Sequence, residues 1–242
     1  DLGVSFCCCD EDDDDLEDYV ILKPDWITNA LYIMLFNECE GAENGLIPHK
    51  SIRALLKNAA KDPQIRCVLP EARYDQPGDF RYVMGVLERF QLAFQGKENH
   101  EFLPMLCQRD SAVDIPACEE DQDMLEFHME FEYLPNNVLH RLMVERQQEL
   151  DMDNVWLTGA RFAQPETGLS AVVVIDENLL RIFVSHESSL HRPNTYLAQL
   201  KANVDRIRLR MGLPEPDCLL IYKYRGLRVP FRYERLLKMQ KK

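Results

Sequence analysis

The side chains best suited to chemistry are spread thinly along this sequence of 242 residues. Of its six histidines, only His186 and His191 lie close together, on either side of a short polar stretch. Ser188 or Ser189 could serve as a nucleophile with His191 as its base, but the sequence places neither an orienting acid nor an oxyanion hole beside them. We therefore expect a polar loop at this position and keep a serine hydrolase only as a third hypothesis.

Patterns that bind phosphate or metal are absent from the sequence. Neither the P-loop pattern G-x-x-x-x-G-K-[ST] nor G-x-G-x-x-G occurs, and there is no G-x-S-x-G or H-E-x-x-H. Cys7, Cys8 and Cys9 stand beside the acidic run 10–15, but the spacing suits neither tetrahedral zinc nor a calcium loop. We interpret the run as a solvated loop, and we expect no catalytic residue, cofactor or metal in this chain.

Charge is distributed unevenly between the two halves of the chain. Residues 1–124 hold 26 acidic and 11 basic side chains, a balance of −15, whereas residues 125–242 hold 15 and 17, a balance of +2. An acidic surface opposes binding to the phosphate backbone, so we expect no nucleic-acid partner. The basic stretch from Lys223 to Lys242 is interpreted as a solvated tail or as a face for an acidic neighbour.

Cysteine usage and hydropathy indicate a cytoplasmic protein. The eight cysteines form no C-x-x-C pair, and no secretory signal precedes them, so reduced thiols are expected. No apolar run reaches the roughly 20 residues that a membrane-spanning helix needs. The chain begins without methionine in a strand-like stretch, which suggests that it is part of a longer protein.

The first half has the pattern of a small helical unit with a hairpin. Short strands are expected near 4–9 and 19–22, and helices with one apolar face at 24–35, 52–59 and 80–90. The stretch 41–51 is interpreted as a turn. Two apolar runs around Gly96–Asn99 then predict a β-hairpin, which gives the unit a winged-helix character.

In the second half, apolar and polar residues alternate as they do in β-strands. Residues 125–133 predict a strand with apolar side chains inward and Glu126, His128, Glu130 and Glu132 in water. A helix after Pro135, three strands between 154 and 186, a long helix from Asn194 or Thr195, and a strand pair around Arg225–Gly226 follow. The expected fold is α+β, with a winged-helix-like domain (1–115), a linker (116–124) and an antiparallel sheet with helices on one face (125–242).

Three segments, in order, resemble the COR domain, which follows the Roc GTPase in Roco proteins. "YVILKPDWITNALYIML" (19–35) is similar to its strand–Pro–x–Trp–helix opening. "NGLIPHKSI" (44–52) with "YVMGVLERFQLAFQGKENHEFLPML" (82–106) resembles the next stretch. "FEYLPNNVLHRLMVE" (131–145) resembles the passage that opens the second COR subdomain.

The resemblance implies structural roles for five residues and a division of labour between the halves. Pro24 and Trp26 would hold the core of the first subdomain, while Pro135, Arg141 and Leu142 would open the second. In the family, the first half packs on the Roc GTPase in cis and the second half forms a homodimer. GTP and magnesium are then expected only in the Roc domain of the parent protein.

The leading hypothesis is therefore a non-catalytic dimerisation and regulatory module, with a DNA-binding winged-helix regulator as the alternative. A symmetric dimer needs one self-complementary patch. We predict it on the second half, whose net charge is near zero, in the apolar hairpin 172–184 and the loop 186–193. The predicted interface residues are Val172, Val174, Ile182, Val184, His186 and His191.

Overall fold

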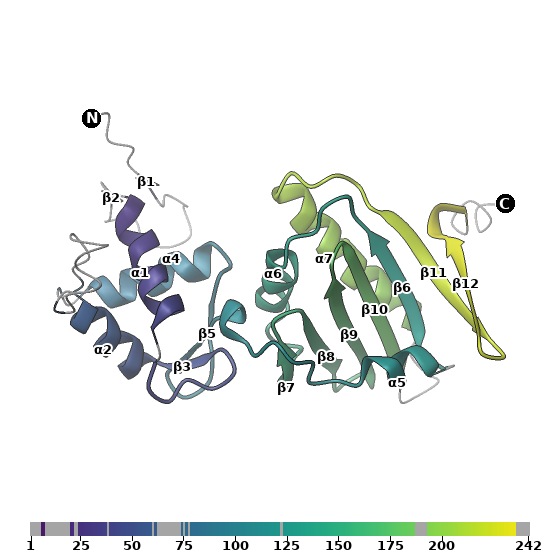
Figure 1. The fold of residues 1–242 in the computed structure, drawn as a ribbon, viewed down its shortest axis with the longest axis horizontal. Helices are drawn as coiled ribbons and strands as arrows, with labels where there is room; N and C mark the ends of the chain where they lie inside the picture. Colours follow the sequence, from purple (N-terminus) through teal and green to yellow (C-terminus); the bar gives the residue numbers. More distant parts are fainter. Residues whose placement is uncertain are drawn as a thin grey trace. The chain divides into compact units, whose positions relative to one another are not determined.

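The computed structural model describes residues 6–7, 20–21, 24–37, 39–59, 61, 74, 76, 78–121, 123–186 and 193–235. The chain forms two compact units, Asp1–Leu106 and Cys107–Lys242 (Figure 1). The fold is α+β, as predicted: the first unit combines helices with a three-stranded sheet, and the second packs helices on a seven-stranded antiparallel sheet. Most of the predicted linker 116–124 lies in or beside helix α5 (Ile115–Glu120), which belongs to the second unit.

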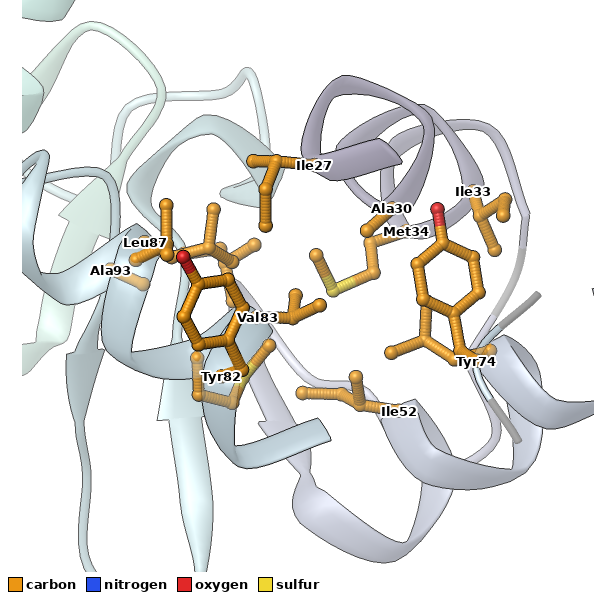
Figure 2. Close-up of a cluster of buried hydrophobic side chains, with 14 of the residues drawn as sticks. Ile27, Ala30, Ile33, Met34, Ile52, Tyr74, Tyr82, Val83, Leu87 and Ala93 are labelled. Carbon is orange, nitrogen blue, oxygen red and sulfur yellow. The ribbon is translucent and has the colours of Figure 1, made fainter. Parts of the chain in front are cut away.

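Among the described residues, three helices build the core of the first unit. They are α1 (Pro24–Phe36), α2 (His49–Ala59) and α4 (Asp79–Arg89). Pro24 begins α1 at a position where its missing N–H is not needed. Figure 2 shows how the apolar side chains of the helices meet, together with Tyr74 and Ala93 from the loops. Residues labelled there are Ile27, Ala30, Ile33, Met34, Ile52, Tyr74, Tyr82, Val83, Leu87 and Ala93.

A small antiparallel sheet completes this unit, in the order β3-β5-β4. The predicted hairpin is present as β4 (Phe94–Gln95) and β5 (His100–Phe102). Strand β3 (Leu46–Pro48) pairs with β5, so part of the stretch expected to be a turn is a strand. A separate pair joins β1 (Phe6–Cys7) to β2 (Val20–Ile21). Phe90, the last residue of the predicted helix 80–90, is 43% exposed because α4 ends just before it.

The second unit is built on one antiparallel sheet in the order β12-β11-β6-β10-β9-β8-β7. Four strands, not three, lie between Leu150 and His186, because the chain reverses direction both before and after Gly159–Gln164. The strands are β6 (Leu125–Glu130), β7 (Leu150–Trp156), β8 (Gly159–Gln164), β9 (Leu169–Asp176), β10 (Leu179–His186), β11 (Asp217–Tyr224) and β12 (Leu227–Arg232).

Helices cover one face of this sheet, and α5 covers part of the other. Helix α7 (Pro193–Arg210) packs on β10 and β6, and α6 (Asn137–Glu145) packs on β9, as Figure 1 shows. On the opposite face, α5 and the residues around it pack against a cluster that includes Trp156 and Phe183. Both faces of the central strands are therefore buried. None of the described helices combines the length and the apolar character needed to cross a bilayer.

Candidate interaction surfaces

The outermost strand pair carries a row of exposed apolar side chains, which we call the apolar ribbon. It consists of Tyr222 (56% exposed), Tyr224 (50%), Leu227 (66%), Val229 (40%) and Phe231 (44%). The register pairs Tyr222 with Val229 and Tyr224 with Leu227, and it places Phe231 opposite Leu220. Residues paired across antiparallel strands share a face, so all five lie on one side of the hairpin. Figure 1 shows this hairpin at the edge of the sheet.

The turn of the hairpin and its outer strand indicate which side of the hairpin a partner can contact. Arg225 (φ 51°) and Gly226 (φ 77°) both adopt the left-handed conformation that a tight two-residue hairpin turn requires. The outer strand β12 contains Pro230, which has no N–H to donate. Proline in an edge strand discourages another strand from pairing there. A partner is therefore expected on the face of the hairpin and not along its edge.

The other face of the same hairpin carries charged side chains that contact α5 and β6, which corrects the sequence-based interpretation. Glu126 was expected in water, but it is fully buried. Lys223 Nζ lies 3.4 Å from Glu126 Oε2 and donates to the carbonyl oxygens of Cys118 (2.9 Å) and Asp121 (3.0 Å). His128 Nε2 lies 2.7 Å from Glu126 Oε1. The acidic neighbour considered for the basic stretch is thus provided, for Lys223, by the chain itself.

Arg228 and Glu119 extend this charged cluster from β12 to α5 and β10. Arg228 Nη1 donates to Glu119 Oε2 at 3.1 Å, and Arg228 Nη2 pairs with Glu126. The other oxygen of Glu119 accepts from Arg181 on β10. One α5 carboxylate therefore joins two strands that do not neighbour each other.

The charges around Glu126 decide its protonation state. Burial tends to raise the pKa of Glu126, but the hydrogen bond from His128 opposes it. The positive charges of Arg228 and Lys223 act in the same direction as His128, so the pKa lies below its ordinary value of 4.5. Glu126 is a carboxylate at neutral pH, and its ion pairs are formed.

The structure places four of the predicted interface residues inside the second unit. Val172 and Val174 are buried in the cluster beneath α5, while Ile182 and Val184 are buried on the face covered by helices. They have no surface to offer a second chain, because α5 covers the face that the sequence left open. His186 is exposed at the end of β10. His191, like Ser188 and Ser189, lies outside the described residues.

Trp26, one of the two motif residues of the first unit, packs against the core of that unit. Trp26 is partly buried against the helices, with its ring centroid 4.9 Å from that of Tyr74 and 6.1 Å from that of Tyr82. The Tyr74 hydroxyl donates to the carbonyl oxygen of Trp26 at 2.6 Å. Burial, followed by the charge of Asp79, raises the pKa of that hydroxyl, so it stays protonated. Pro24 is the first residue of the helix that carries Trp26.

The motif residues of the second unit lie on helix α6 or just before it. Leu142 is fully buried, and the carbonyl oxygen of Pro135 accepts from the N–H of Val138 at 3.1 Å. Arg141 is half-buried, and its Nε has no hydrogen-bond partner among the described residues. His140, on the same helix, is buried, and its Nε2 lies 3.0 Å from the carbonyl oxygen of Leu157. Burial lowers the pKa of His140, so the ring is neutral and structural.

The first unit exposes an aromatic pair on α1. Tyr32 (49% exposed) and Phe36 (77% exposed) are one helical turn apart and stack with ring centroids 5.7 Å apart. Large aromatic side chains exposed together on a helix are typical of contact surfaces. Neither residue was singled out from the sequence, where Tyr32 fell outside the apolar stripe.

The first unit does not concentrate positive charge on α4, the helix that a DNA-binding winged helix would place in the groove. Its exposed side chains include Arg81 and Glu88, and most of the rest of α4 is buried. Exposed basic residues gather instead on and just after α2, at Lys50, Arg53, Lys57 and Lys61. A DNA-binding interface would need the charge on α4 and the adjoining hairpin.

A buried pair in the first unit resembles a reactive site but is better explained as structural. His49 Nε2 lies 3.1 Å from Glu101 Oε2, and Glu101 is 1% exposed. Burial, followed by the charge and hydrogen bond of Glu88, raises the pKa of Glu101 to about 8. Burial also lowers the pKa of His49, so both groups are neutral at pH 7. Among the described residues, no group of three or more histidine, cysteine or acidic side chains could hold a metal ion.

No family model matches the chain, and no curated protein matches it.

Proposed function

We propose that this chain is a non-catalytic regulatory and dimerisation module of a Roco GTPase. Its first unit packs on the Roc domain in cis, and its second unit self-associates. The apolar ribbon is the observation that carries the proposal, and the three COR-like segments support the family assignment. The sequence has no phosphate-binding motif, so the Roc domain supplies GTP and magnesium binding.

The size of the ribbon supports a protein partner. Its five side chains are each about half exposed, and large apolar side chains offer about 200 Å² each, which gives roughly 500 Å² of apolar surface. A patch of this size on a soluble unit commonly marks an interaction site. A stable dimer buries about 800 Å² per partner, so the contact must extend beyond the five side chains. Arg225 is a candidate for this extension, because its guanidinium lies 5.1 Å from the ring centroid of Tyr224.

A second copy of the chain is the partner that the charge distribution favours. The half that carries the ribbon has a net charge of +2 (17 basic and 15 acidic residues in 125–242), so two copies repel each other weakly. The acidic first half, at −15, would oppose self-association through its own surface. Pro230 directs the contact to the face of the hairpin, where the two copies can pack side chains around a two-fold axis.

The exposed aromatic pair on α1 supports docking of the first unit on the GTPase. Tyr32 and Phe36 provide a rigid apolar contact that needs little ordering on binding. We place the protein in the cytoplasm, since Cys39, Cys107, Cys118 and Cys218 are free thiols. Reduced cysteines are typical of that compartment.

Sedimentation equilibrium of the 242-residue chain tests the self-association. We expect a monomer–dimer equilibrium, with the Kd weakened at least tenfold in the double variant Tyr222→Thr/Phe231→Thr. Threonine keeps the preference for a strand while removing the aromatic rings. The control is Tyr133→Thr, which removes a ring that is 64% exposed in the same unit but outside the ribbon. A wild-type chain that stays monomeric at about 100 μM, or a double variant that dimerises like the control, would refute the proposal.

A further inference from the structure

We propose that α5 and the charged face of the hairpin form a clamp that positions the apolar ribbon and thereby regulates association through it. The clamp consists of Glu119, Glu126, Lys223 and Arg228. Its effect on association rests on the proposed function above, whereas its effect on the hairpin does not.

The tip of the hairpin has little support from the sheet. Strand β11 pairs with β6 only over Asp217–Ile221. Beyond that point, residues 222–229 pair only with each other, as a two-stranded hairpin with a tight turn. An isolated two-stranded hairpin is at best marginally stable in water. Another contact must hold the tip in place.

The clamp provides that contact from the side opposite the ribbon. Lys223, whose side chain is only 2% exposed, donates to the carbonyl oxygens of Cys118 and Asp121 in and next to α5. Arg228 pairs with Glu119 on α5 and with Glu126 on β6. Hydrogen bonds of charged groups at partly or fully buried positions are the strong ones. Both strands of the tip are thereby attached to the sheet and to α5.

Clamp and ribbon residues alternate along the same two strands. Lys223 lies between Tyr222 and Tyr224, and Arg228 lies between Leu227 and Val229. A movement of α5 that draws Lys223 and Arg228 with it must therefore reposition the ribbon on the other face. Helix α5 follows closely on the end of the first unit in the sequence. A change that reaches residues 107–114 is consequently passed through α5 to the surface that a second copy contacts.

Hydrogen–deuterium exchange on the 242-residue chain tests the clamp directly. Glu119→Gln removes the carboxylate that joins Arg228 to Arg181, at a side chain exposed enough (28%) for the fold to tolerate the change. We expect amide exchange in 222–229 to accelerate about tenfold, the equivalent of about 1.4 kcal/mol. The control is Asp123→Asn, which removes one charge from an exposed side chain in the same segment.

The outcomes separate the clamp from the proposed self-association. Faster exchange at 222–229 together with weaker dimerisation, in Glu119→Gln but not in Asp123→Asn, supports the full inference. Faster exchange in Glu119→Gln, combined with a wild-type chain that never dimerises, refutes the proposed function and its regulation while retaining the clamp. Exchange at 222–229 that is equal in Glu119→Gln and the control overturns the clamp.

Discussion

The Lys223→Met substitution removes a buried positive charge while keeping a flexible apolar stem of similar length. In the wild type, Lys223 Nζ donates to the carbonyl oxygens of Cys118 and Asp121 and faces Glu126 at 3.4 Å. The substitution leaves two backbone carbonyl oxygens without that donor. It also removes one of the cations that balance a fully buried carboxylate.

The contacts of Lys223 determine how much the free energy of unfolding should fall. A hydrogen bond to a charged group contributes about 1.5–3 kcal/mol, and removing one partner of a buried ion pair costs about 3–5 kcal/mol. Glu126 retains Arg228 and His128 as partners, so the loss belongs at the lower end of that range. We expect the free energy of unfolding of the second unit to fall by about 3 kcal/mol.

Urea unfolding followed by tryptophan fluorescence can measure this loss for the second unit alone. The chain has two tryptophans, Trp26 in the first unit and Trp156 in the cluster beneath α5. In a Trp26→Phe background, the signal therefore comes only from the second unit. With a urea dependence of about 2 kcal/mol per molar, the midpoint should move down by roughly 1.5 M.

Two further variants make the interpretation secure. Arg235→Met removes the same charge from an exposed position near the end of the described chain, and it should change the midpoint little. Glu126→Gln combined with Lys223→Met should recover part of the loss, because the buried charge and its partner are then removed together. A Lys223→Met variant within about 1 kcal/mol of Arg235→Met would refute the assignment of a stabilising role to the buried cluster.

Two other predictions concern stability in each unit. Burial, followed by Glu88, raises the pKa of Glu101 to about 8, so the folded first unit holds a proton that the unfolded chain releases. The contribution of Glu101 to stability is therefore greatest below its ordinary pKa of 4.5, and it falls as pH rises to about 8. In urea titrations that follow Trp26, Glu101→Gln should reduce the dependence of the free energy of unfolding on pH, whereas the control Glu98→Gln should leave it unchanged. An unchanged pH dependence in Glu101→Gln would contradict the burial argument. Gly159→Ala should destabilise the second unit by about 2–3 kcal/mol, because the added carbon would lie 1.9 Å from Cζ2 of Trp156. A urea midpoint equal to that of the wild type would show that the ring moves aside freely.

Local periodicity was sufficient to predict most helices and the hairpins. The apolar positions of α7, for example, recur at helical spacing, and Leu197, Leu200, Val204 and Ile207 are all buried. The same reasoning went wrong where one strand is covered on both faces. Val172, Val173 and Val174 are consecutive and all buried. Such an unbroken run is the pattern of a strand buried on both sides, and it was assigned instead to a dimer surface.

The charged clamp could not be predicted from local sequence patterns. Glu126 alternates with apolar residues as a water-facing residue would, and the strand pattern is the same whether water or a cation covers that face. Its partners are distant in sequence: Arg228 follows Glu126 by 102 positions and Glu119 by 109. The excess of basic residues in 223–242 suggested an acidic neighbour, but composition carries no information about which carboxylates the fold brings there.

The charged side chains of the clamp restrict the register of the hairpin strands, which apolar side chains at the same positions would not do. Well-packed apolar side chains are often at least as stabilising as a buried ion pair, so stability alone does not explain Lys223 and Arg228. Side chains alternate between the faces of a strand, and a register slip of one residue exchanges the two faces. Such a slip would bury Tyr222 against the carboxylates and leave Glu126 without its cations. Since an unpaired buried charge is costly, the clamp allows one register only, and in that register the apolar ribbon faces outward.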